Sequence, residues 1–137
     1  MPQVLDPCDG VMTNFEVAQL LIQQQKRRAE DEAALPLPGA RRTSQSSAWS
    51  AQQSVSQISE QILAYLNKTP STSQSHEGIT AFLEAVQTFK LTRMEMLSLV
   101  NTPPSSFVEV HLLVEECEDR LTVEQQKELI ALCQRTL

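Results

Sequence analysis

Three helix starts fall within the last third of the chain, residues 91–137, and they constrain its fold more than any other feature. Each start places a glutamate or glutamine three positions after a hydroxyl residue, which is the spacing of a capping box. The pairs are Thr92 with Glu95, Ser106 with Glu109, and Thr122 with Gln125. Because short, separately capped helices with apolar stripes pack on one another, this region predicts a compact bundle and not one long rod.

The bulk properties of the chain are consistent with one ordinary domain that carries an arm. The chain has 137 residues and a formal net charge of −6, which argues against an all-over basic surface for nucleic acid. Three cysteines without a CxxC pair argue against a zinc site or a disulfide framework, and favour a reducing compartment. No apolar run approaches the length of a membrane span, and the first ten residues do not resemble a secretory signal.

Residues 11–34 are expected to form the first helix, with Thr13 and Glu16 as a fourth capping box. Its apolar stripe consists of Phe15, Ala18, Leu21 and Ile22, broadened by Val17 and Leu20. Residues 11–17 also alternate between apolar and polar, so a short extended stretch is an alternative, but a helix from about Asn14 is favoured.

Residues 35–54 are expected to be a low-complexity linker. Pro36, Pro38 and Gly39 stop the first helix, and the following serine, glutamine, alanine and threonine residues offer little apolar surface to offset the entropy of ordering. Trp49 is the exception in this segment. It either begins the next helix at the edge of the bundle or provides a contact point for another protein.

The remaining segments carry apolar residues at helical spacing, and no stretch alternates like a strand, so the predicted fold is all-α. The helix over 55–67 would bury one stripe and the helix over 76–89 another. The stripes are Val55, Ile58, Ile62, Tyr65 and Leu66, and Ile79, Phe82, Leu83, Val86 and Phe89. The last three helices would bury Met94, Leu97 and Val100; Phe107, Val110, Leu113 and Val114; and Leu121, Leu129, Leu132, Cys133 and Leu137.

No group of residues suggests catalysis, a cofactor or a metal. His76 and His111 are thirty-five residues apart, so they form no metal-binding pair on one helix. His76 is interpreted as a solvated or capping residue, and His111 as a residue at the edge of the core. The acidic run over 115–119 is interpreted as a solvated face that pairs with Arg120, or alternatively as the rim of a contact with a basic partner.

Cys117 and Cys133 lie near apolar stripes, where cysteine acts as a small buried hydrophobe. The basic clusters at 26–28 and 41–42 lack interleaved aromatic residues, so they are weak indications of nucleic-acid binding. The chain is therefore expected to be a binding or structural protein and not an enzyme.

Two segments, which together cover about half of the chain, resemble a known family. The first is Thr13-Asn14-Phe15-Glu16-Val17 followed by Leu20-Leu21. The second begins with Phe89-Lys90-Leu91-Thr92, includes Glu95, Leu97, Asn101 and Pro104, and ends with Val114-Glu115-Glu116-Cys117-Glu118-Asp119-Arg120-Leu121-Thr122. In this order they resemble the smaller stalk subunit of RNA polymerase III, a family that includes the calcitonin-gene-related-peptide receptor component of animals and has a relative in the stalk of archaeal RNA polymerase.

The resemblance implies a nuclear, non-catalytic subunit that forms a heterodimer with the larger stalk subunit, which has a tip domain and an OB-type domain. It implies three regions: a tip-associated segment over 1–34, the linker over 35–54, and an HRDC-like helical domain over 55–137. The pair would protrude from the polymerase core and support initiation by contacting initiation factors. Little direct nucleic-acid binding and no membrane association are expected.

The first helix is the candidate partner-binding segment. An isolated amphipathic helix on an arm must either fold back on its own bundle or bury its apolar face on another chain. The residues alone leave both possibilities open, and the resemblance favours the partner. The candidate partner-binding residues are Asn14, Phe15, Glu16, Val17, Leu20, Leu21 and Ile22.

Three alternatives remain: a stalk subunit of another RNA polymerase, a bundle that binds nucleic acid, and a receptor-signalling accessory at the plasma membrane. The acidic balance of residues 109–128 weighs against nucleic acid. The second residue is Pro2, not the glycine of a myristoylation signal, and Cys133 is one residue too far from Leu137 for a CaaX box.

Overall fold

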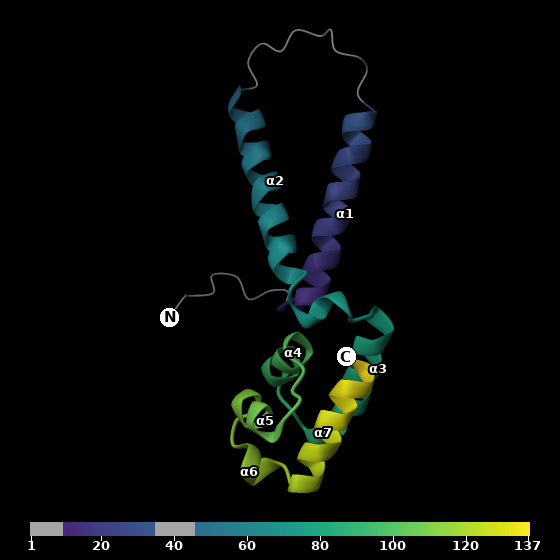
Figure 1. The fold of residues 1–137 in the computed structure, drawn as a ribbon, viewed down its shortest axis with the longest axis vertical. Coiled ribbons are helices and arrows are strands. Elements are labelled where there is room, and N and C mark those ends of the chain that lie inside the picture. Colours follow the sequence, from purple (N-terminus) through teal and green to yellow (C-terminus); the bar gives the residue numbers. More distant parts are fainter. Residues whose placement is uncertain (1–9, 35–45) are drawn as a thin grey trace.

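The computed structural model describes residues 10–34 and 46–137, and every regular element within these ranges is helical. The all-α prediction is therefore confirmed. The α-helices are α1 (Asn14–Ala33), α2 (Ser46–Leu66), α3 (His76–Ala85), α4 (Arg93–Asn101), α5 (Phe107–Leu113), α6 (Cys117–Arg120) and α7 (Val123–Thr136), and the 3₁₀ helices are η1 (Pro70–Thr72) and η2 (Val86–Phe89). As Figure 1 shows, α1 and α2 lie side by side as a hairpin that projects from a bundle of α3 to α7.

All four predicted capping boxes are present, and they define where α1, α4, α5 and α7 begin. At the start of α1, the Glu16 N–H donates to Oγ1 of Thr13 at 3.2 Å, and the Thr13 N–H donates to Oε2 of Glu16 at 2.7 Å. A capping box uses only residues three positions apart, so its formation depends little on the rest of the fold. This is why these helix starts could be located in the sequence.

One apolar core lies within the bundle. Its buried residues are Ile79, Phe82, Val86, Phe89, Leu99, Val100, Val110, Val114, Cys117, Leu121, Leu129, Leu132 and Cys133. The predicted burial of Cys117 and Cys133 is confirmed, and burial raises the pKa of the Cys133 thiol to about 12. A thiol with so high a pKa is not a ready nucleophile at neutral pH, which agrees with a packing role.

The predicted inner face of α4 is partly wrong, because Met94 is 59% exposed and Leu99 is fully buried in its place. The reason is electrostatic. Glu95 lies one helical turn before Leu99 and is itself buried, held on the inner side of α4 by an ion pair that apolar periodicity does not reveal.

The Glu95 carboxylate joins three segments of the bundle. Oε1 accepts the Arg120 guanidinium at 2.6 Å and the Glu115 N–H at 3.1 Å, while Oε2 accepts a second guanidinium N–H of Arg120 at 3.1 Å and the Thr92 N–H at 2.7 Å. Arg120 also donates to the carbonyl oxygens of Glu115 and Lys90. The expectation that Arg120 pairs with the acidic run is therefore wrong, because its charge partner is Glu95 on α4.

This network predicts a loss of stability in acid. The Arg120 guanidinium lowers the pKa of Glu95 from 4.5 to about 2, against the opposing effect of burial, and the N–H groups of Thr92 and Glu115 lower it further. Because the pKa is lower in the folded state, the ionised carboxylate stabilises the fold above pH 4.5, by about 3 kcal/mol. That contribution should disappear as the pH falls from about 4.5 to about 2, measured as the free energy of unfolding from urea titrations. The stability gap between wild type and Glu95→Gln should shrink over the same range, and a constant gap would contradict this account.

Helices α3 and α7 lie close together at Gly78. A Cβ atom at this position would overlap the carbonyl oxygen of Thr136, and the Gly78 N–H donates to the N-capping Oγ of Ser75 at 3.0 Å. Only glycine therefore fits between the two helices.

Gly78→Ala should lower the free energy of unfolding by about 1–2 kcal/mol, because overpacking against a backbone atom outweighs the better helix propensity of alanine. Ala81→Ser, at an exposed position of the same helix, should change it by less than about 0.5 kcal/mol. Urea denaturation measures both. Unchanged or increased stability of Gly78→Ala would show that α7 can shift to make room.

The linker prediction over 35–54 is wrong for residues 46–54, which belong to α2. The serine, alanine and glutamine residues of this segment form no apolar stripe, so periodicity does not predict a helix here. They are nevertheless compatible with a helix that packs against α1. Residues 35–45 lie outside the described ranges. Trp49 lies in α2, as one interpretation expected, but its side chain is outside the described set, so neither interpretation of its contacts is tested.

Candidate partner interface

Within 10–34 and 46–137, no three metal-ligating side chains come together, and no helix is long and apolar enough to cross a membrane. His76 is exposed at the first position of α3, after the N-cap Ser75, as expected. His111 is also exposed, which corrects its assignment to the core edge; its Nδ1 lies 4.0 Å from Oε1 of Glu118. The features described next are the exposed apolar surfaces of the hairpin.

Helix α2 has its apolar side facing outward. Its buried residues include Ser59 and Leu66, and Ser56 lies on the same side, where its Oγ accepts a hydrogen bond from Arg28 of α1 at 3.2 Å. The stripe predicted to face the core is largely exposed instead. The exposed fractions are 47% for Val55, 56% for Ile58, 38% for Ile62 and 65% for Tyr65.

These four side chains, called here the outer α2 face, recur at helical spacing on one side of α2. Single exposed apolar residues are ordinary, but a continuous stripe of large ones marks an interaction surface. The prediction that this stripe is core was wrong because periodicity identifies an apolar face without identifying what covers it. Ser56, on the side that contacts α1, is small enough for close packing of the two helices, whereas the outer α2 face stays exposed for a second contact.

The structure separates the seven candidate residues of α1 into two groups. Asn14, Phe15 and Glu16 have contacts within the chain: the Asn14 N–H donates to Oδ1 of Asn101 at 2.8 Å, Phe15 packs against the core, and Glu16 completes the capping box. Val17 and Leu21 are half-buried.

Leu20 and Ile22 are the exposed members of the group, at 41% and 38%. They are two positions apart and therefore lie on opposite flanks of α1, so the seven residues do not form a single free face. The contact with α2 explains this arrangement, since the helix does fold back on its own chain along one side.

The hairpin is tied to the bundle where α1 and α2 meet it. Besides the Asn14–Asn101 hydrogen bond, the buried Gln74 donates through Nε2 to the carbonyl oxygen of Val100 at 2.6 Å. Both bonds end on the last turn of α4, and Figure 1 shows this helix lying next to the base of the hairpin. The Asn14 bond ties the start of α1 to the bundle, and the Gln74 bond ties the segment between η1 and α3 to it.

The chain is similar to proteins of known function. Residues 11–137 match the RNA polymerase Rpb4 family. A curated relative from Dictyostelium discoideum, DNA-directed RNA polymerase III subunit rpc9, is 31% identical over 123 residues, which is 85% of this chain and 78% of the relative. Subunits of this family are non-catalytic, as expected from the missing site chemistry. The match spans the hairpin and the whole bundle, and the chain belongs to the RNA polymerase Rpb4 family.

Proposed function

We propose that this chain is the smaller stalk subunit of RNA polymerase III and works in the nucleus. Membership of the Rpb4 family makes it a polymerase subunit with partners inside the polymerase complex. The assignment to polymerase III rests on the similarity to the rpc9 subunit, which extends over 85% of this chain. In this proposal the bundle is an HRDC-like domain, and the subunit supports initiation at small RNA genes by contacting initiation factors.

The partner that we propose for the hairpin is the larger stalk subunit, with its tip and OB-type domains. The observation that carries this assignment is the outer α2 face, since a stripe of large apolar side chains favours a lasting protein contact. On α1, Leu20 and Ile22 are exposed on opposite flanks, so one of the two can extend this contact, and we propose Leu20. Phe15, Val17 and Leu21 then support the surface from behind, because they are partly covered by their own chain.

The outer α2 face supplies one part of the energy that a stable subunit contact needs. The four side chains of the outer α2 face are about half exposed. Covering them should contribute roughly 4 kcal/mol, at about 1 kcal/mol for each half-buried side chain, before the entropy losses of association. Main-chain and polar contacts would have to supply the rest of the affinity.

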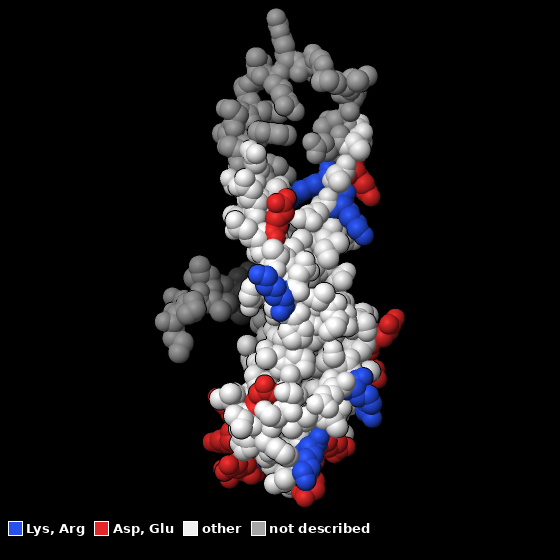
Figure 2. Space-filling model, in the orientation of Figure 1, with Lys and Arg blue, Asp and Glu red and all other residues white. Residues whose placement is uncertain are grey.

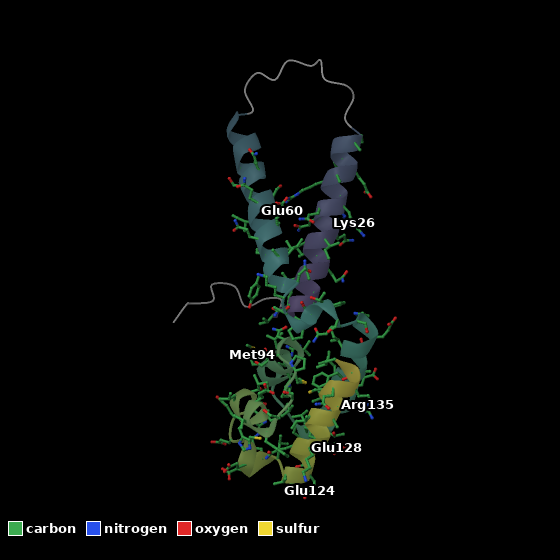
Figure 3. All side chains as sticks on the ribbon, viewed as in Figure 1. Lys26, Glu60, Met94, Glu124, Glu128 and Arg135 are labelled. Atoms are coloured by element: carbon green, nitrogen blue, oxygen red, sulfur yellow. The ribbon has the colours of Figure 1, made fainter. Side chains whose placement is uncertain are left out.

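A membrane surface suits the outer α2 face less well. Helices that lie on membranes usually carry lysine and arginine on their polar face. Helix α2 has neither, and Glu60 is its single charged residue. Figure 3 shows Glu60 on α2 and Lys26 on α1, and the basic residue that bonds to α2 in the described structure, Arg28 to Ser56, comes from α1. A protein partner is therefore the better match.

Affinity purification of the tagged chain from its own cells tests the polymerase assignment. Mass spectrometry of the copurifying proteins should find the subunits of RNA polymerase III, with the larger stalk subunit in equal amount. Enrichment of RNA polymerase I or II instead would reassign the chain to another stalk. Recovery mainly with plasma-membrane receptors would support the signalling alternative and contradict the proposal.

A further inference from the structure

Helix α5 carries a second exposed apolar surface, in a part of the molecule away from the hairpin. Val108 is 70% exposed and Leu112 is 80% exposed, while Val110 and Val114 turn inward and are buried. Val108 and Leu112 are four residues apart, so they are neighbours on the outer side of α5. Such high exposure of two large aliphatic side chains in the folded chain leaves a pair of apolar contact points without a partner.

A surface hollow of about 370 Å³ lies beside Leu112. Leu112 forms part of its wall, together with Glu115, Glu116, Glu118 and Asp119. One member of the apolar pair therefore borders a depression whose remaining wall is mostly acidic. Figure 2 shows acidic side chains gathered at the end of the molecule that contains α5 and α6.

The arginine next to this hollow offsets its negative charge only in part, because Arg120 feels Glu115 and Glu116 electrostatically but pairs directly with Glu95. The guanidinium of Arg120 donates to the Glu95 carboxylate and to the backbone carbonyl oxygens of Glu115 and Lys90, and to no carboxylate of the run. His111 is near enough to interact with Glu118 only weakly, at 4.0 Å. Most of the acidic wall is thus available to positive groups of another molecule.

We propose that the outer side of α5 and the adjoining hollow, together called the acidic groove, bind a lysine- and arginine-rich amphipathic segment of another protein. An apolar side chain of that segment would pack between Val108 and Leu112. Its basic side chains would pair with the carboxylates of Glu115, Glu116, Glu118 and Asp119. Nucleic acid is excluded as the ligand by its own negative charge. The hairpin is a poor competitor for such a segment, because Lys26, Arg27 and Arg28 would repel it.

The contact should combine modest affinity with strong dependence on salt. Rim charges mainly accelerate and orient association, whereas the apolar anchor slows dissociation. This inference does not depend on which polymerase contains the chain, nor on the hairpin partner.

A synthetic peptide of leucine and lysine, patterned as an amphipathic helix and labelled with fluorescein, can test the acidic groove in the full chain. Its binding should be measured by fluorescence anisotropy against a scrambled peptide of the same composition. NMR shift changes should identify the residues contacted. We expect the patterned peptide to bind more tightly than the scrambled one, to shift mainly amides of residues 107–121, and to weaken as salt is raised.

Paired variants distinguish binding in the acidic groove from nonspecific attraction to exposed apolar or acidic residues elsewhere. V108S/L112S should weaken binding by about fivefold or more, and E118Q/D119N should do the same. L83S/M94S and E60Q/E77Q remove matching apolar groups and charges outside both proposed contact surfaces and should leave the affinity within about twofold of wild type. All these side chains are exposed, so each variant should fold, which circular dichroism can check. No binding to wild type, equal binding of the scrambled peptide, or equal losses in the control variants would overturn the proposal.

Discussion

Glu95→Gln should lower the free energy of unfolding by about 3 kcal/mol at pH 7, as expected for breaking a buried ion pair. The carboxylate of Glu95 is 7% exposed and accepts four hydrogen bonds, two of them from Arg120. A glutamine amide presents its NH₂ group to donors in either orientation, since each oxygen of Glu95 faces one backbone N–H and one guanidinium N–H. The variant would therefore lose the charge and also place donor against donor.

Urea denaturation followed by circular dichroism measures this loss. Glu128→Gln, a charge-neutralising change on α7 (Figure 3), should alter the stability by less than about 0.5 kcal/mol. Adding Arg120→Met to Glu95→Gln should destabilise the fold by less than the sum of the two single changes, because the arginine is then no longer left unpaired. If Glu95→Gln were as stable as Glu128→Gln, the network would not be what holds α4 against α6.

Ile58→Glu and Ile62→Glu should each weaken binding to the larger stalk subunit by about tenfold or more, if the outer α2 face is the contact. A carboxylate buried there would meet an apolar surface without a counter-charge. Both isoleucines are partly exposed in the free chain, at 56% and 38%, so the folded chain should tolerate the charge. The measurement is the dissociation constant of the two purified subunits by isothermal titration calorimetry.

Gln57→Glu is the matched control, because it places the same charge on an exposed position of α2 outside the apolar stripe. It should bind within about twofold of wild type. Leu20→Glu reports on the α1 flank and should have an intermediate effect. If both isoleucine variants bound with wild-type affinity, the outer α2 face would not be the interface. A similar loss of affinity in Gln57→Glu would indicate a general effect of the added charge.

The parts of the fold that could be predicted are those fixed by neighbouring residues. The four capping boxes need only a hydroxyl and a carboxylate or amide three positions apart, and all four formed where they were expected. Most of the inward stripes of α3 and α7 were also recognisable, because Phe82 and Leu129 lie in helices that pack into the bundle. The prediction was wrong for Leu83, which is 38% exposed at the edge of the α3 stripe. In these cases the chemistry of neighbouring residues and the helical spacing of apolar residues were sufficient to predict the structure.

The errors arose where distant segments decide the outcome. The pairing of Arg120 with Glu95 spans 25 residues, and nothing near either residue indicates it. The exposure of Ile58 depends on α1 packing against the serine side of α2, so the same stripe could have been core or interface. The first turns of α2 have no apolar period at all. For the candidate site, resemblance directed attention to α1, whereas the larger exposed face lies on α2.

Tyr65 allows the most direct test of the docking proposal, because it is the only tyrosine in the chain, is 65% exposed and belongs to the outer α2 face. Hydroxyl-radical footprinting with mass spectrometry can compare its oxidation rate in the free chain and in the one-to-one complex with the larger stalk subunit. Met94, 59% exposed on α4, is the internal reference. We expect Tyr65 to be strongly protected in the complex while the rate at Met94 stays the same. An unchanged rate at Tyr65 in a fully formed complex would contradict docking through α2.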